Sequence, residues 1–303
     1  MSNLTRLVFF LFLLAPTLGF AGAPPLVDAT WMKANLNTPD LVVLDIQEPK
    51  DYRRFHVPGA VNAPYGSWRT SDKGVPVGML PTTERLEALI GGLGIDNGKT
   101  VVVVSTGRGA GDLAAAARVF WTFKVLGHEA VSVLDGGLVS YAQGRNPLES
   151  PVNRPEPTKY VARPDPELML NIEGAKALLA NQGGFVDARS AGEFVGLYRG
   201  GKEERPGTIP GSKNLPYDWV TEDGSGKLRD AGALEALFAA RGIAHEGEQV
   251  HFCHSGNRAA LTWFAAYAVL GNKQARLYDG SMMEWARQED LPVEQQIKLC
   301  DAC

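Results

Sequence analysis

The residues best suited to chemistry follow a short apolar run that ends at Cys253. A polar turn comes next, and a helix-like run begins at Ala259. The turn consists of His254, Ser255, Gly256, Asn257 and Arg258. A turn between a strand and a helix receives backbone N–H groups and the positive end of the helix dipole, and both stabilise an anion. A cysteine at a strand end is more often a buried apolar residue, but this polar turn favours a reactive thiolate at Cys253.

Composition places this turn in a folded globular protein. Hydrophobic residues make up 45% of the 303 residues, charged residues make up 21%, and the net charge is -4. The length predicts two domains, each able to bury a core. The mild acidity and the lack of a lysine or arginine run argue against a nucleic-acid partner.

The N-terminal segment has the features of a secretory signal peptide. Arg6 supplies a positive charge, residues 7–14 are apolar, and small residues follow at Ala21 and Ala23. We predict a signal peptide over residues 1–22, with cleavage after Ala21 and export to a periplasm. An uncleaved anchor is the alternative, although a membrane span needs roughly 20 apolar residues. After cleavage, no membrane association is expected.

Three cysteines are too few for a fold held together by disulfides. In an oxidising compartment, Cys300 and Cys303 are expected to form a local disulfide, which leaves Cys253 as the free thiol. The tail pair could instead accept a persulfide or bind a partner. No further ligands with suitable spacing lie nearby, so no metal and no other cofactor is predicted.

Apolar runs alternate with helix-like segments in the first half of the chain. Residues 41–44, 101–104 and 130–134 are predicted strands. Helical patterns cover residues 83–93 and 112–125. This alternation is typical of parallel sheets covered by helices.

Prolines are dense between residues 146 and 166, where apolar periodicity is weak. We predict an N-terminal domain over residues 23–150, a linker over 151–163 and a C-terminal domain over 164–303. A long loop inside one domain is the alternative, but such loops are uncommon in compact domains.

The second half of the chain repeats motifs of the first in the same order. The matching segments are 44–45 with 186–187, 57–65 with 209–217, 125–127 with 269–271, and 134–136 with 278–280. Ordered matches of this kind predict two copies of one α/β unit.

The two copies differ where the reactive cysteine lies. Ser105 occupies the strand end that Cys253 occupies in the second copy, and a longer glycine-rich turn follows over residues 106–111. That turn matches neither the P-loop nor the dinucleotide-binding pattern, so we interpret it as a degenerate active loop. The second copy also has an extra stretch over residues 196–207, which we interpret as a solvated loop, with Arg199 as a less favoured pocket residue.

With these motifs, the chain resembles the rhodanese family of sulfurtransferases in its two-domain form. The resemblance rests on residues 187–189, 209–212, 253–258 and 134–137. It implies an α/β fold of two tandem rhodanese-like domains, each a mainly parallel sheet flanked by helices. It also implies an N-terminal copy without the catalytic cysteine, which agrees with Ser105.

The resemblance further implies transfer of a sulfane sulfur. Cys253 would attack a small anionic donor such as thiosulfate, become a persulfide, and pass the sulfur to cyanide or a thiol. The turn residues 254–258 would bind the donor together with Arg189, for which a structural ion pair is an equal alternative. A thiolate in a ring of N–H groups needs no metal for this chemistry.

Departures from the family leave the donor open. Thiosulfate-type members have two basic residues after the cysteine and mercaptopyruvate-type members have Gly-Ser-Gly-Val, whereas His254 begins a different turn here. Glu193 stands where members often have arginine, which removes a positive charge near the site. The alternative donor is therefore 3-mercaptopyruvate.

Two other functions use a similar loop. A cysteine-dependent phosphatase has arginine six positions after its cysteine, whereas Arg258 lies five positions after Cys253, so the ring is too short for phosphate. A periplasmic persulfide carrier that serves a redox or sulfur-acceptor protein is the other alternative, and the tail cysteines motivate it.

The remaining histidines are given smaller roles. His254 is expected to attract an anionic donor because histidine charges near neutral pH. His251 lies on the same side of its strand as the thiol, but it is not favoured as a general base. His56 is expected to serve packing.

Overall fold

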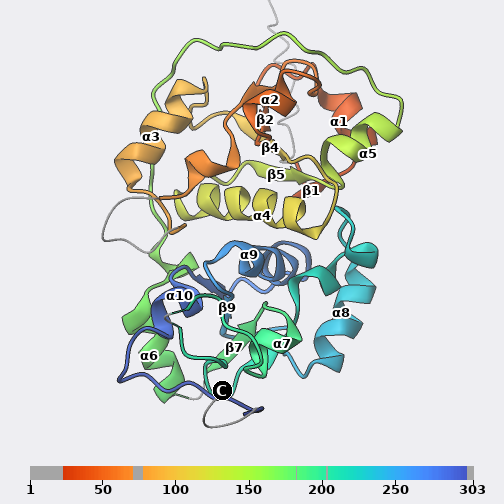
Figure 1. Ribbon diagram of the computed structural model, residues 1–303. Helices are drawn as coiled ribbons and strands as arrows, with labels where there is room; N and C mark the ends of the chain where they lie inside the picture. The colour runs from red at the N-terminus through yellow and green to blue at the C-terminus, as the bar shows by residue number, and fades with distance from the viewer. Residues whose placement is uncertain (1–22, 71–77, 182, 203, 299–303) are drawn as a thin grey trace, which may run out of the picture.

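The structure is a computed structural model that describes residues 23–70, 78–181, 183–202 and 204–298. The predicted signal peptide and both tail cysteines lie outside the described residues. Figure 1 shows two domains, one above the other, with α4 of the first facing α9 of the second. Within the described ranges, no helix has both the length and the apolar character required to cross a bilayer.

The N-terminal domain is built on a parallel sheet with the strand order β1-β5-β4-β2-β3. Its strands are β1 (Leu26–Val27), β2 (Leu41–Asp45), β3 (Val61–Asn62), β4 (Thr100–Val104) and β5 (Val131–Leu134). Its helices are α1 (Ala29–Asn35), α2 (Pro49–Tyr52), η1 (Tyr65–Trp68), α3 (Thr83–Gly92), α4 (Ala110–Val125) and α5 (Gly137–Gln143). Helices cover both faces of the sheet, which is why its central strands are continuous apolar runs.

The C-terminal domain repeats this order as β6-β10-β9-β7-β8. Its strands are β6 (Met169–Leu170), β7 (Gly184–Asp187), β8 (Lys213–Asn214), β9 (Gln249–Phe252) and β10 (Ala275–Tyr278). Its helices are η2 (Pro166–Leu168), α6 (Ile172–Ala180), α7 (Ala191–Phe194), η3 (Tyr217–Val220), η4 (Glu222–Gly224), α8 (Ala231–Ala240), α9 (Asn257–Phe264), η5 (Ala265–Val269) and α10 (Ser281–Trp285). The predicted duplication and the α/β fold are confirmed.

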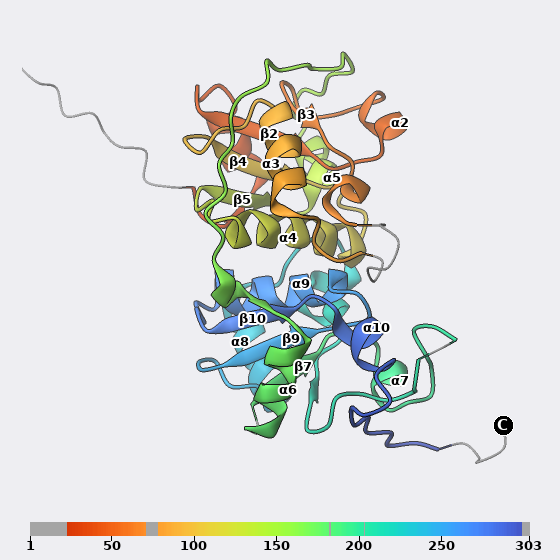
Figure 2. The ribbon, with the colours of Figure 1, turned by 90° about the vertical axis from the view of Figure 1, so that its left-hand side faces the viewer.

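The chain between α5 and η2 connects the domains along the outside of the first one (Figures 1 and 2). The predicted linker over residues 151–163 lies within this segment, which contains no helix and no regular strand. Backbone hydrogen bonds fix it to the N-terminal domain: the N–H of Thr158 donates to the carbonyl of Gly91 at 2.8 Å, and the N–H of Arg163 donates to that of Leu126 at 2.9 Å. The connector is therefore bound to its domain rather than free.

The contact between α4 and α9 has an apolar centre that is continuous with the cores of both domains. On α4, the ring of Phe120 meets Phe264 of α9 edge-on, with 4.9 Å between ring centroids, and lies 6.2 Å from Trp263. The helix α9 begins at Asn257, two residues before the predicted start at Ala259 and inside the predicted reactive turn. This packing therefore fixes the position of that turn relative to the N-terminal domain.

Candidate active site

Cys253 lies where the sequence predicts it, between the end of β9 and the start of α9. The central position of β9 in its sheet places the thiol at the carboxyl edge, and only 1% of the residue is exposed. Gly256 precedes α9 with a φ of 77°, in the left-handed region that glycine adopts at little cost. A Cβ on Gly256 would lie 2.5 Å from Nη1 of Arg118. Both the backbone conformation and the lack of space for a side chain therefore require glycine at this position.

The turn presents donors for an anion. Among the described residues, the backbone N–H groups of His254, Ser255 and Gly256 have no hydrogen-bond acceptor. They precede the first turn of α9, whose dipole favours negative charge. An anion bound beside the thiol would complete these hydrogen bonds, as in an oxyanion hole.

Ser281 supports Cys253 from the start of α10. Its hydroxyl accepts a hydrogen bond from the N–H of Cys253 at 3.1 Å and donates to the carbonyl of Tyr278 at 2.8 Å. Its φ is 52°, a conformation that costs a non-glycine residue on the order of 1–3 kcal/mol. The predicted match of residues 134–136 with 278–280 stops one residue before Ser281, and sequence reasoning missed it.

Arg258 forms a two-pronged ion pair with Glu193 of α7. Its Nη1 and Nη2 donate to the two carboxylate oxygens at 2.7 and 2.9 Å. Burial raises the pKa of Glu193, but the hydrogen bonds and charge of Arg258 outweigh it and hold the pKa at about 2. Burial likewise lowers the pKa of Arg258, and Glu193 reverses this effect. The guanidinium predicted to bind a donor thus already has a carboxylate partner.

Arg189 is also paired. It is buried, and its Nε and Nη2 donate to Asp187 at 3.0 and 2.6 Å, while Nη2 also donates to the carbonyl of Gly207 at 2.7 Å. This is the structural ion pair that the sequence left as an equal alternative. Donor binding by Arg189 stays a prediction.

His254 contacts the extra stretch of the second copy. Its Nε2 lies 2.9 Å from Oε1 of Glu204, whose side chain is buried. A Cβ on Gly200 would lie 2.3 Å from Cδ2 of His254, which shows how closely the stretch packs. The prediction of a solvated loop is wrong for Glu204, although Arg199 is exposed. No motif or spacing in the sequence indicated the contact between His254 and Glu204.

The N-terminal domain contributes two further side chains to the turn. The hydroxyl of Tyr65 donates to Oδ1 of Asn257 at 2.5 Å. Nη2 of Arg69 donates to the carbonyl and hydroxyl oxygens of Ser255 at 2.6 and 3.2 Å. Burial raises the pKa of Tyr65, and the positive charge of Arg69 counters part of that rise. Tyr65 belongs to the repeated segment 57–65, but nothing in the repeat indicated a contact across domains.

A buried ion pair joins the domains beneath the turn. Nη2 of Arg118, on α4, donates to Oδ1 of Asp279 at 2.5 Å, and its Nη1 lies 3.4 Å from the carbonyl of Gly256. The other carboxylate oxygen of Asp279 accepts from the N–H of Leu80 at 2.7 Å. Both charged groups are almost completely buried, so each is the charge partner that offsets the loss of hydration of the other.

His251 and His56, which the sequence also offered, do not contact the turn through a hydrogen bond. His251 is fully buried with Nδ1 3.0 Å from Oγ1 of Thr262, and burial lowers its pKa to about 3. His56 stacks on Tyr52 at 3.8 Å and bonds to the carbonyl of that residue. Within the described part of the chain, no group of three or more His, Cys, Asp or Glu side chains is placed to hold a metal ion.

The sequence matches the Rhodanese-like domain over residues 28–143 and again over residues 171–288. The chain belongs to the rhodanese family. Its first rhodanese-like domain carries Ser105 at the strand end where its second carries Cys253.

Related proteins cover nearly the whole chain. A "Putative thiosulfate sulfurtransferase" of Mycobacterium tuberculosis is 31% identical over 277 residues, which span 89% of this chain and 97% of the relative. The "Thiosulfate/3-mercaptopyruvate sulfurtransferase 1, mitochondrial" of Arabidopsis thaliana is 32% identical over 302 residues, spanning 89% and 78%. The crystal structure of SseA from Escherichia coli, described among the 3-mercaptopyruvate sulfotransferases, has a TM-score of 0.75 and 26% identity over 86% of this chain and 99% of SseA.

Proposed function

We propose that this rhodanese is a sulfurtransferase that moves a sulfane sulfur from thiosulfate to a thiophilic acceptor such as cyanide through a persulfide on Cys253. The observation that carries the proposal is the turn after Cys253, in which three successive backbone N–H groups have no acceptor among the described residues and directly precede α9. The name of the mycobacterial relative supports thiosulfate as the donor.

The proposed reaction consists of two displacements at sulfur. The thiolate of Cys253 attacks the outer sulfur of thiosulfate; the new S–S bond forms while the S–S bond of thiosulfate breaks, and sulfite leaves with the electron pair. The carbon of cyanide then attacks the outer sulfur of the persulfide, the persulfide bond breaks, and the thiolate returns as thiocyanate leaves. The N–H groups of the turn would stabilise the donor and the persulfide anion.

A second donor, 3-mercaptopyruvate, is favoured by the charges around the turn. Glu193 pairs with Arg258 and Glu204 pairs with His254, so the two cationic side chains of the turn itself are already engaged and are not free for a dianion such as thiosulfate. A donor with a single carboxylate needs less positive charge at the turn than thiosulfate does. In that reaction the thiolate would attack the mercaptan sulfur, the C–S bond would break, and the pyruvate enolate would take up a proton.

The burial of Cys253 supports a small-molecule donor over a docked partner protein. A persulfide carrier that serves a periplasmic redox or sulfur-acceptor protein is therefore the less favoured function. Export through residues 1–22 is part of this proposal, and we expect the purified mature protein to begin near residue 22.

Steady-state assays with thiosulfate plus cyanide, 3-mercaptopyruvate plus cyanide, and an aryl phosphate test the proposal. We expect thiocyanate from thiosulfate with the higher kcat/KM and no release of phosphate. A higher kcat/KM with 3-mercaptopyruvate would favour the second donor. Phosphate release without thiocyanate would contradict sulfur transfer altogether.

A further inference from the structure

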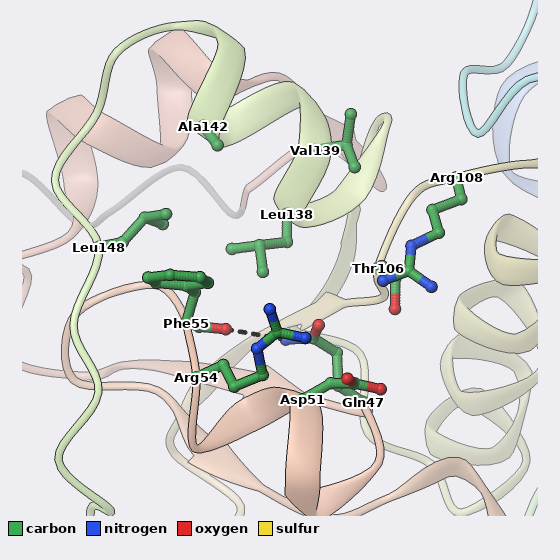
Figure 3. Close-up of a pocket in the computed structure, with 10 residues that line it drawn as sticks. All are labelled: Gln47, Asp51, Arg54, Phe55, Thr106, Arg108, Leu138, Val139, Ala142 and Leu148. Carbon is green, nitrogen blue, oxygen red and sulfur yellow. Dashed lines mark hydrogen bonds between the residues drawn. The ribbon is translucent and has the colours of Figure 1, made fainter.

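The N-terminal domain has a pocket where the active domain has its reactive turn. Its cavity of about 230 Å³ lies at the carboxyl ends of β2 and β4, next to α2 and α5. Figure 3 shows Leu148 and the ring of Phe55 on one side, Thr106 and Arg108 on the other, and Leu138 between them. None of these residues takes part in the proposed reaction.

This pocket is open because the N-terminal domain lacks the extra stretch of the second. The backbone of His56 forms an isolated antiparallel β-bridge with Glu149, and the backbone of Thr208 forms the same bridge with Glu294. His56 and Thr208 are therefore equivalent positions in the two domains. In the first domain Phe55 directly precedes His56, whereas residues 198–207 precede Thr208 in the second.

The inserted residues occupy the equivalent space in the second domain. The carbonyl of Thr106 accepts from the N–H of Val139 at 3.0 Å, as the carbonyl of His254 accepts from that of Met283 at 2.9 Å. Thr106 therefore corresponds to His254, on which Gly200 of the insertion packs. Without an insertion, the position next to Thr106 is available to a ligand.

The charges of the pocket suit a monoanion. Arg54 and Arg108 are exposed and have no carboxylate partner among the described residues. Asp51 lines the same cavity, so its charged side chains sum to one positive charge. Guanidinium groups bind carboxylates through short, charge-assisted hydrogen bonds.

The remaining wall suits an apolar body. Phe55 is 54% exposed, and Leu138, Val139 and Leu148 continue the wall. An apolar group bound here would remove this surface from water, which is favourable in proportion to the area covered.

We propose that the N-terminal rhodanese-like domain binds a small monocarboxylate with an apolar body, its carboxylate at Arg54 and Arg108 and its body against Phe55 and Leu138. The site is separate from Cys253 and does not depend on the proposed sulfur transfer.

Isothermal titration with 4-methylpentanoate tests the proposal. We expect one molecule to bind per chain, and an Arg54→Gln/Arg108→Gln protein to bind at least tenfold more weakly, because it loses the charge-assisted hydrogen bonds to the carboxylate. The matched control, Lys50→Gln/Arg53→Gln, loses two exposed charges from the same helix region outside the pocket and should bind like the wild type.

The neutral 4-methylpentanamide should bind at least tenfold more weakly than the carboxylate. Absence of binding to the wild type, equal affinity of the pocket variant, or equal affinity of the amide would each overturn the proposal. Circular dichroism of each variant establishes that it is folded. A crystal soaked with the carboxylate should show it at Arg54 and Arg108; occupancy only beside Cys253 would also overturn the proposal.

Discussion

The two rhodanese-like domains have the same strand order, yet a few side chains at the carboxyl edge of the sheet separate them. Ser105 replaces Cys253, and Gly137 with a φ of 54° replaces Ser281 with a φ of 52°. Gln47 takes the place of Arg189 beside the strand-end aspartate. The backbone of the fold is therefore common to both domains, whereas the proposed chemistry requires the thiol and the groups that position it.

The largest expected effect comes from exchanging the nucleophile. Cys253→Ser should lower thiocyanate formation by at least about 10³-fold, because a neutral hydroxyl replaces the thiolate. Ser105→Cys, in a Cys253→Ser background, should restore none of it, since its turn is one residue longer before α4 begins after Gly109. Steady-state assays measure both. Recovery of activity in the double variant would show that the longer turn of the N-terminal domain does not prevent a cysteine there from reacting.

The second-largest effect is expected on the free energy of unfolding, when the ion pair between the domains is broken. Arg118→Met leaves Asp279 buried without its charge partner, which costs about 3–5 kcal/mol of the free energy of unfolding. Urea unfolding measures the loss. Adding Asp279→Asn removes the unpaired charge and should recover part of it; no recovery would mean that Arg118 acts through packing on Trp121 instead.

Ser281→Gly makes the second domain resemble the first at one position. Glycine relieves the left-handed φ but removes the acceptor for the N–H of Cys253. We expect stability to stay within about 1 kcal/mol of the wild type and kcat/KM to fall about tenfold, as for loss of one hydrogen bond. Ser281→Ala removes the same hydroxyl without relieving the left-handed φ and should lower kcat/KM by a similar factor. Unchanged kcat/KM in the glycine variant would exclude a positioning role.

The last prediction concerns stability rather than activity, at the strand-end aspartate of the N-terminal domain. Burial raises the pKa of Asp45 from 3.8 to about 6, although hydrogen bonds from Gln47 oppose the rise. The folded state therefore holds the proton more tightly than the unfolded state, and the stabilisation from this group is complete below pH about 4 and is lost as pH rises through about 6.

Asp45→Asn should remove that contribution to the pH dependence. Between pH 4 and 6, the free energy of unfolding of the wild type should fall, relative to the variant, with a slope of at most about 1.4 kcal/mol per pH unit. Urea unfolding at four pH values measures the difference. Parallel curves for the two proteins would contradict the assigned cause.

Much of the fold could be predicted from the sequence because its signals are local or repeated. The valine run of β4 and the apolar run of β2 were predicted within one residue of their observed bounds, and α4 begins two residues before the predicted start. The motif pairs fixed the duplication. The turn after Cys253 followed from the order of strand, glycine and helix.

The partners of the turn could not be predicted in the same way. Tyr65, Arg69 and Arg118 reach it only because α4 packs on α9, and such packing leaves no local pattern in the sequence. The pairing of His254 with Glu204 depends on the path of an insertion without periodicity. The positive charge of Arg258 led to the prediction that it binds an anionic donor, whereas in the structure Arg258 forms an ion pair with Glu193.

Mass spectrometry of the intact protein after exposure to thiosulfate tests the central claim most directly. The account predicts that the protein gains the mass of one sulfur atom, that peptide mapping places it on Cys253, and that cyanide removes it. The same treatment should leave Cys253→Ser unchanged. A sulfur that maps elsewhere, or a Cys253→Ser protein that still carries sulfur and turns over, would contradict the account.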